Sequence, residues 1–136
     1  MVISPTKTKF RKHQRRRVRG KATGGVSISF GEYALQSLES GYLTVNQIEA
    51  ARKALTHYLK RGGKVWVRAF ADKIITARPA ETRMGGGKGA PVAFVAPIRQ
   101  GHIIFEIGGI PQAEAKKALH LASYKLPLKT RFMEKI

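Results

Sequence analysis

Residues 81–91, with the sequence ETRMGGGKGAP, combine four glycines with one lysine, a composition typical of loops that bind phosphate groups. A P-loop needs a Ser or Thr directly after its Gly-Lys pair, where the hydroxyl binds Mg²⁺. In this chain Gly89 follows Lys88, and Thr82 stands where the first glycine of the motif belongs. The segment is therefore not a P-loop.

A second nucleotide-binding motif, the dinucleotide fingerprint, also fails here. Gly85, Gly87 and Ala90 have its spacing, but that motif must open a helix. Pro91 and the apolar residues after it predict a β-strand instead. What remains is a long glycine-rich loop between two strands, and loops of this kind are often functional.

The side chains of this loop suit contact with RNA. Arg83 and Lys88 supply positive charge, Met84 supplies an adaptable apolar contact, and the glycines permit close approach of the backbone. We predict that the loop inserts into folded RNA, with a disordered hairpin tip as the alternative.

Catalytic and metal chemistry have little support in the sequence. The four histidines lack metal-ligand spacing, the eight carboxylates are dispersed, and there is no cysteine. We therefore expect no enzyme activity, no catalytic residue, no metal, no cofactor and no small-molecule substrate.

The formal net charge of +18 favours a polyanionic partner, which could be RNA, DNA or an anionic membrane surface. Basic residues crowd positions 1–21, and the first acidic residue is Glu32. We predict that residues 1–21 form a basic arm, extended or disordered until a polyanion neutralises it, in which Phe10 and His13 can stack on bases. The alternatives are a solubilising tail and an organelle transit peptide, although the arm has almost no Leu or Ala for an apolar helical face. No apolar run is long enough to span a bilayer.

The elements after the arm begin with a predicted half-buried strand at residues 26–30, and residues 33–39 could form a strand or a helix. The clearest helix covers residues 44–62, with Thr44 and Gln47 at capping-box spacing and Glu49 placed to pair with Lys53. Its apolar face is Ile48, Ala51, Leu55 and Leu59. Its opposite face is mostly basic, and either solvent or phosphate could lie against it: Arg52, Lys53, Thr56 and Lys60.

Two hairpins and a second helix complete the predicted domain. Residues 64–70 should pair with 74–78, and residues 92–98 with 102–107. The last helix should start at Pro111 and stop before Pro127. This order predicts an α+β sandwich, in which two main helices cover one face of an antiparallel or mixed sheet. The single domain would span residues 22–136, with the functional loop at 79–91, and would be embedded in structured RNA on several sides.

Six segments in order resemble the bacterial-type large-subunit ribosomal protein L sixteen family, from Pro5 to Phe132: KTKFRKHQR, SISFGEYALQSLE, QIEAARKA, RGGKVWVR, RPAETRMGGGKGAP and KLPLKTRF. The resemblance implies an α+β protein bound to large-subunit (23S-type) rRNA near the peptidyl-transferase centre, joining late in assembly and helping the subunit mature. It implies contact with A-site tRNA, with P-site tRNA as a further candidate, and a place near the 5S rRNA region and neighbouring ribosomal proteins. The location would be a ribosome in the bacterial cytoplasm or inside an organelle (chloroplast or mitochondrion), without a membrane partner.

Composition and resemblance together give two groups of expected site residues. The rRNA-binding residues are Lys7, Lys9, Phe10, Arg11, Lys12, His13, Arg15, Arg16, Arg17, Arg19, Arg52, Lys60, Arg68 and Arg78. The loop residues, which the resemblance directs towards the tRNA acceptor end and the peptidyl-transferase centre, are Arg83, Met84, Gly85, Gly87, Lys88 and Gly89.

The sequence departs from the family pattern at Ala71 and Ile74, where prolines are usual, and at Val92 and Phe94, where glutamate and tryptophan are usual. We expect the first two to loosen the hairpin turn. Two other hypotheses stay open at this point: a stand-alone basic module for DNA or an anionic membrane, and a phosphate-handling enzyme.

Overall fold

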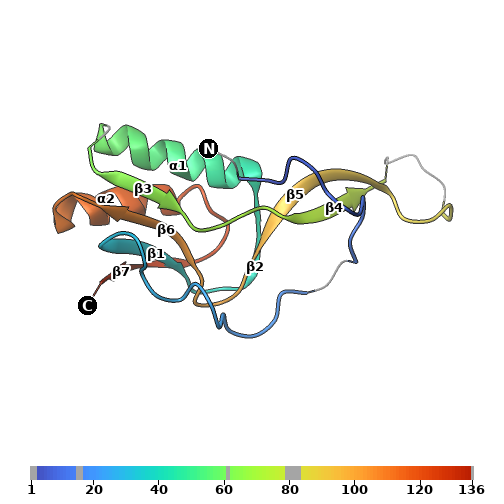
Figure 1. Ribbon diagram of the computed structural model, residues 1–136, viewed down its shortest axis with the longest axis horizontal. Coiled ribbons are helices and arrows are strands. Elements are labelled where there is room, and N and C mark those ends of the chain that lie inside the picture. Colours follow the sequence, from blue (N-terminus) through green and yellow to red (C-terminus); the bar gives the residue numbers. More distant parts are fainter. Residues whose placement is uncertain (1–2, 15–16, 61, 79–83, 136) are drawn as a thin grey trace.

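The computed structural model describes residues 3–14, 17–60, 62–78 and 84–135. Within these ranges the chain forms two helices and seven strands (Figure 1). The helices are α1 (Val45–Leu59) and α2 (Gln112–Ser123). The strands are β1 (Tyr33–Ser37), β2 (Gly41–Thr44), β3 (Lys64–Val67), β4 (Lys73–Ala77), β5 (Ala90–Ile98), β6 (Ile103–Gly108) and β7 (Thr130–Glu134).

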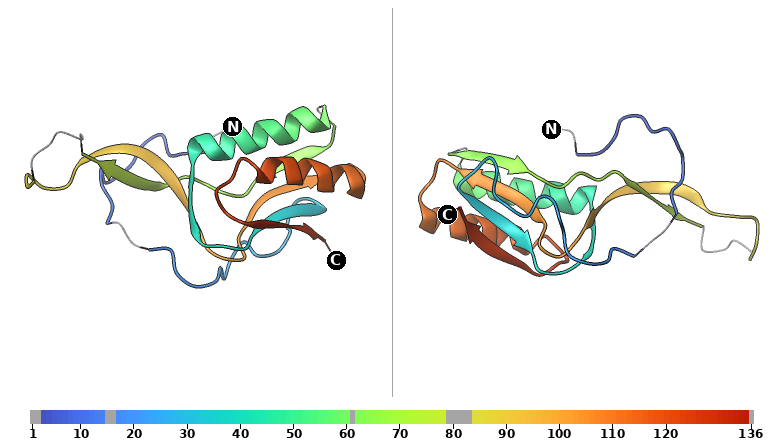
Figure 2. Two further views of the ribbon diagram at one scale, coloured as in Figure 1. Left: turned by 180° about the vertical axis from the view of Figure 1, so that it is seen from behind. Right: turned by 60° about the horizontal axis from the view of Figure 1, so that its bottom comes forward.

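Four strands form the sheet of the main body, in the order β3-β6-β1-β7, and every pairing is antiparallel. The two helices lie side by side against one face of this sheet (Figures 1 and 2). The predicted α+β architecture, with both helices on one face, is confirmed.

The other three strands form a second antiparallel sheet in the order β2-β5-β4. Its long pair β4–β5 projects from the body as a ribbon, and the glycine-rich loop joins the two strands at the far end (Figure 1). This part of the structure places the loop well away from the helices.

The two predicted hairpins are wrong, because the chain changes sheet where they were expected to turn. β3 pairs with β6, whereas β4 pairs with β5, so residues 68–72 cross from one sheet to the other. β5 and β6 also belong to different sheets, although the chain does turn between them, with His102 N–H donating to the Arg99 carbonyl. Ala71 and Ile74 therefore do not flank a hairpin turn.

The alternating residues 26–30 do not form the predicted strand. The N–H groups of Ser29 and Phe30 donate to the carboxylate of Glu106 instead of to a neighbouring strand. Alternation predicts only which side chains could be buried, and a strand also needs a partner edge.

Helix α1 begins as predicted, because the Thr44 hydroxyl accepts from the Gln47 N–H and the Gln47 side chain accepts from the Thr44 N–H. It ends at Lys60, which adopts a left-handed conformation with φ of 49°. Its apolar face packs as expected, except that Leu59 is half-buried. Helix α2 buries Ala115, Ala118, Leu119 and Ala122.

The core lies between the helices and the four-stranded sheet and continues to the base of the ribbon. Its largest fully buried side chains include Phe105, Leu43, Ile48 and Leu55. Ile3, at the start of the arm, is also buried in this core. Ile3 is thus part of the folded domain.

We expect Thr44→Ala to lower the free energy of unfolding by about 1 kcal/mol, because it removes the side-chain acceptor of the α1 capping box. The measurement is urea unfolding followed by circular dichroism. Thr56→Ala is the matched control, since the Thr56 hydroxyl bonds only to carbonyls within the same helix. Equal losses in the two variants would contradict the role of the cap.

Candidate nucleic-acid interface

The glycine-rich loop joins two strands and does not open a helix, which agrees with the exclusion of both nucleotide-binding motifs. In its described part, Gly85, Gly86 and Gly87 have φ values of 100°, 80° and 82°, and their surroundings are open. Met84 is fully exposed. Arg83 lies outside the described residues. The tip thus presents backbone and an apolar side chain to the surroundings.

The base of the loop is closely packed, whereas its tip is surrounded by open space. A Cβ atom at Gly89 would lie 2.6 Å from the Ala77 carbonyl oxygen. Arg78 donates through Nη2 to the Gly87 carbonyl. Gly89 is therefore required by the close approach of two backbones, whereas Gly85 and Gly87 are required by their left-handed conformations.

The arm lies across the ribbon (Figures 1 and 2) and is fixed to it at two backbone donors. Ala71 N–H donates to the Ile3 carbonyl at 2.8 Å, and Ile74 N–H donates to His13 Nδ1 at 3.2 Å. Ile74 belongs to β4, an edge strand, so the arm covers part of that edge. Proline at position 71 or 74 would have no N–H to donate.

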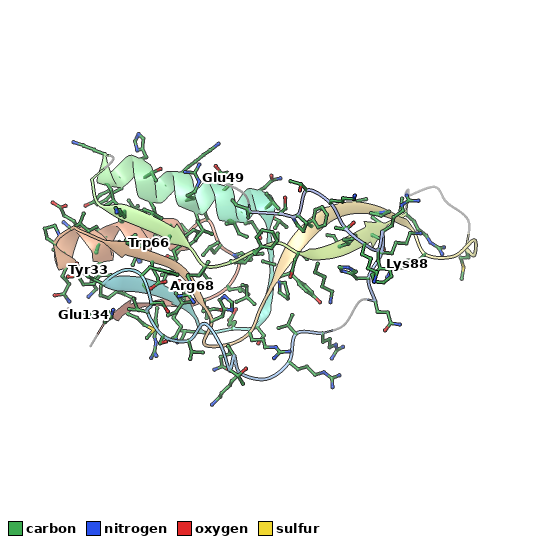
Figure 3. The ribbon with its side chains drawn as sticks, in the orientation of Figure 1. Tyr33, Glu49, Trp66, Arg68, Lys88 and Glu134 are labelled. Atoms are coloured by element: carbon green, nitrogen blue, oxygen red, sulfur yellow. The ribbon has the colours of Figure 1, made fainter. Side chains whose placement is uncertain are left out.

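Two lysines connect the arm to the loop. Lys12 Nζ donates to the Lys88 carbonyl at 3.0 Å, and Lys88 Nζ donates to the His13 carbonyl. Figure 3 shows Lys88 beside the arm on the ribbon. The two groups of expected site residues, which are far apart in the sequence, therefore meet at one end of the molecule.

Most of the expected arm residues are exposed: Lys7, Lys9, Phe10, Arg11, Lys12, Arg17 and Arg19. Phe10 is 63% exposed, and Lys9 Nζ lies 5.6 Å from the centre of its ring. Arg15 and Arg16 lie outside the described residues. The exposed ring and cations leave this surface accessible to base stacking and phosphate contact.

Arg52 and Arg68 have carboxylate partners within the chain. Arg52 pairs with Glu49, which was expected to pair with Lys53. Arg68 Nη1 lies 2.7 Å from Glu106 Oε2, and its guanidinium lies 5.3 Å from the centre of the Phe30 ring, which stacks on Trp66. These internal pairs reduce the charge that the two arginines offer to phosphate.

The carboxylate of Glu106 is fully buried and has a complete set of donors. Besides Arg68, the backbone N–H groups of Ser29, Phe30 and Gly31 donate to Oε1 at 2.7, 3.1 and 3.5 Å. Burial raises the pKa of Glu106, but the bonds from Arg68 and the three N–H groups lower it by more, so this pKa lies below its ordinary value.

A second basic surface follows α1 and leads away from the ribbon. It is a groove of about 900 Å³ with Ala50 and Ala54 in its floor. Its basic rim consists of Lys53, His57, Lys60 and Lys125, all of which are exposed. Of the two readings left open for this helix face, the groove favours contact with phosphate, since small floor residues allow a backbone to approach.

Sequence reasoning missed Tyr42, Lys73 and Arg99, which come together on the ribbon sheet. Lys73 Nζ donates to the Tyr42 hydroxyl at 3.0 Å and lies 5.1 Å from the centre of its ring. The only available signal was residue type, because these residues become neighbours only through the pairing of β5 with β2 on one side and with β4 on the other. His102 lies nearby, and burial lowers its pKa although the backbone bond to Arg68 opposes this.

Among the described residues, no group of three or more His, Asp or Glu side chains is placed to bind a metal ion. Neither helix in those ranges is long and apolar enough to cross a membrane.

The comparisons with known proteins agree across nearly the whole chain. Residues 5–133 match the family model described as ribosomal protein L16p/L10e. The chain is 60% identical over 134 residues to large ribosomal subunit protein uL16c of Gracilaria tenuistipitata, covering 98% of this chain and 99% of that protein. It is 58% identical over 132 residues to large ribosomal subunit protein uL16 of Trichodesmium erythraeum, covering 97% and 96%.

We expect Glu106→Gln to lower the free energy of unfolding at neutral pH by about 3 kcal/mol, because it removes the charge that Arg68 and three N–H groups match. The lowered pKa means that this stabilisation is complete above the ordinary value of 4.5 and is lost as pH falls through the folded-state value. The variant should therefore lose less stability on acidification than the original chain. Urea unfolding across the acid range measures both effects.

The matched control is Glu49→Gln, which removes one member of a half-buried surface pair and should change stability by less than about 1 kcal/mol. A Glu106→Gln protein with the original acid dependence would contradict the assignment.

Proposed function

The chain belongs to the ribosomal protein L16p/L10e family of large-subunit ribosomal proteins, and we propose that it binds large-subunit rRNA through its arm, its ribbon loop and the α1 groove. The observation that carries the proposal is the joining of arm and loop by Lys12 and Lys88. It gathers two segments rich in positive charge and backbone donors at one end of the molecule. A surface of this kind suits folded RNA, in which several phosphates converge.

The finer part of the proposal concerns the loop. We infer that Met84, Lys88 and the glycines reach towards the peptidyl-transferase centre and the acceptor end of A-site tRNA, with P-site tRNA as a further candidate. The open, fully exposed tip on a projecting ribbon supports this role. The protein would position RNA, and the chemistry of peptide-bond formation would belong to the RNA.

The remaining parts of the proposal concern assembly and location. The protein would join the subunit late and help it to mature, near the 5S rRNA region and neighbouring ribosomal proteins. The α1 groove, which lies away from the ribbon, supports contact with a second RNA segment. The relatives include bacterial and chloroplast proteins, and the chain accordingly belongs in a ribosome of the bacterial cytoplasm or of an organelle.

We expect that replacing the exposed arm cations Lys7, Lys9, Arg11, Arg17 and Arg19 with Gln lowers affinity for large-subunit rRNA. The slope of log affinity against log salt should become less steep by up to about 4, since each lost phosphate contact removes about 0.7–0.9. Filter binding over a salt series measures this slope.

These substitutions keep Ile3 and His13, which fix the arm to the domain, whereas deletion of residues 1–20 would also remove a core side chain. Deletion should therefore weaken incorporation into large subunits and reduce stability as well. Unchanged rRNA affinity and unchanged co-sedimentation in the glutamine variant would defeat the role of the arm.

We expect simultaneous Gly85→Ala, Gly86→Ala and Gly87→Ala to slow elongation several-fold while the protein still enters subunits. All three positions have positive φ in open surroundings, so alanine displaces the tip without a clash in the fold. The measurement is the elongation rate of reconstituted ribosomes. Gly20→Ala, at a φ of 75° in open surroundings in the arm, is the matched control. Normal elongation in the triple variant would refute the role of the loop.

A further inference from the structure

The outer face of the ribbon sheet carries a row of side chains that the strand register brings together. Val95 of β5 pairs with Thr44 of β2 on one side and with Lys73 of β4 on the other. Tyr42 lies two residues before Thr44, and Ile75 lies two residues after Lys73, so both side chains share this face of the sheet. The opposite face of the sheet carries Leu43 and Ala96, which are buried in the core.

The arm turns part of this outer face into a cavity of about 400 Å³. The sheet supplies the floor, and His13 of the arm and Lys88 of the loop line it from above. The described lining residues are His13, Tyr42, Thr44, Lys73, Ile74, Ile75, Thr76, Lys88 and Val95, and none of them is acidic.

The lining combines the groups that bind a nucleobase. Tyr42 contributes an aromatic ring, and Ile75 and Val95 contribute apolar surface. His13 accepts the Ile74 N–H at Nδ1, so its neutral ring carries a hydrogen on Nε2 and can donate from there. Thr76 adds a hydroxyl that can donate or accept.

A second cavity, of about 390 Å³, shares Lys73 with the first. Arg17 of the arm and Arg99, which follows β5, also line it, and it has no acidic residue among its described lining. Three cations around one cavity suit a phosphate group, because guanidinium and ammonium groups give charge-assisted hydrogen bonds to its oxygens.

We propose that these two neighbouring cavities, which share Lys73, hold one unpaired nucleotide of RNA, with its base against Tyr42 and its phosphate among Lys73, Arg17 and Arg99. This inference rests on the proposed binding of rRNA and names a site within it. An aromatic, apolar cavity next to a cationic one matches the two parts of a nucleotide. A free nucleotide carries the same base and phosphate, so the test must separate the two sources.

The probe is an RNA hairpin with one bulged 2-aminopurine, compared with the same hairpin with 2-aminopurine paired in the stem. With the full chain, we expect a saturable change in fluorescence for the bulged base and little change for the paired base. Affinity should be higher for the bulged hairpin. 2-Aminopurine riboside monophosphate, tested alone, should bind far more weakly than the bulged hairpin.

Tyr42→Leu should weaken binding of the bulged hairpin about tenfold, because base–aromatic stacking is lost, and should leave the paired hairpin unchanged. Tyr42→Phe is the matched control, since it keeps the ring and removes only the hydroxyl. Ile75→Trp, which fills the cavity from the floor, should also abolish the preference for the bulge. Circular dichroism and thermal unfolding check that each variant is folded.

The outcomes separate this inference from the proposed function. If the chain binds rRNA but shows no bulge preference, or if folded Tyr42→Leu behaves like Tyr42→Phe, the nucleotide site is wrong. Binding of the free monophosphate as tight as that of the bulged hairpin would overturn the assignment to RNA. Absence of any rRNA binding would defeat the proposed function itself.

Discussion

The buried carboxylate of Glu106 has to be matched by donors, and those donors come from two connecting segments, one between the main body and the ribbon and one between the arm and the main body. Arg68 directly follows β3, where the chain crosses to the ribbon, and Ser29 to Gly31 lie between the arm and β1. An unmatched buried charge costs several kcal/mol, so the two segments are held in place together. The ribbon and the arm are therefore both tied to the same strand, β6.

The helices could be predicted from the sequence because their signals are local. Thr44 and Gln47 mark the start of α1, and the spacing of Ile48, Ala51 and Leu55 identifies its buried face. Strand pairing depends on distant partners, so the places where the chain changes sheet could not be found from turn signals. Charge identified the arm and the loop, but the bonds between Lys12 and Lys88 and the cavity at Tyr42 depend on register. Glu106 gave no signal, because a glutamate in a strand usually faces solvent.

The meeting of arm and loop brings like charges together. The ammonium groups of Lys12 and Lys88 each donate to a backbone carbonyl, and no carboxylate among the described residues forms an ion pair with either of them. Like charges placed this close repel each other, and a bound polyanion would relieve that repulsion. Part of the cost of ordering the arm is met by its bonds within the fold.

The bonds of the arm also impose an order on biosynthesis. Lys12 bonds to a residue 76 positions later and His13 to one 75 positions later, and Ser29, which follows the arm, bonds to one 77 positions later. A chain made from its N-terminus exposes its most basic segment first, whereas the segments that hold that arm emerge after more than half of the protein has been synthesised. During that interval the basic side chains of the nascent arm are accessible to any nearby nucleic acid. Non-local contacts of this length also close slowly, and the seating of the arm on the ribbon should be the last step of folding.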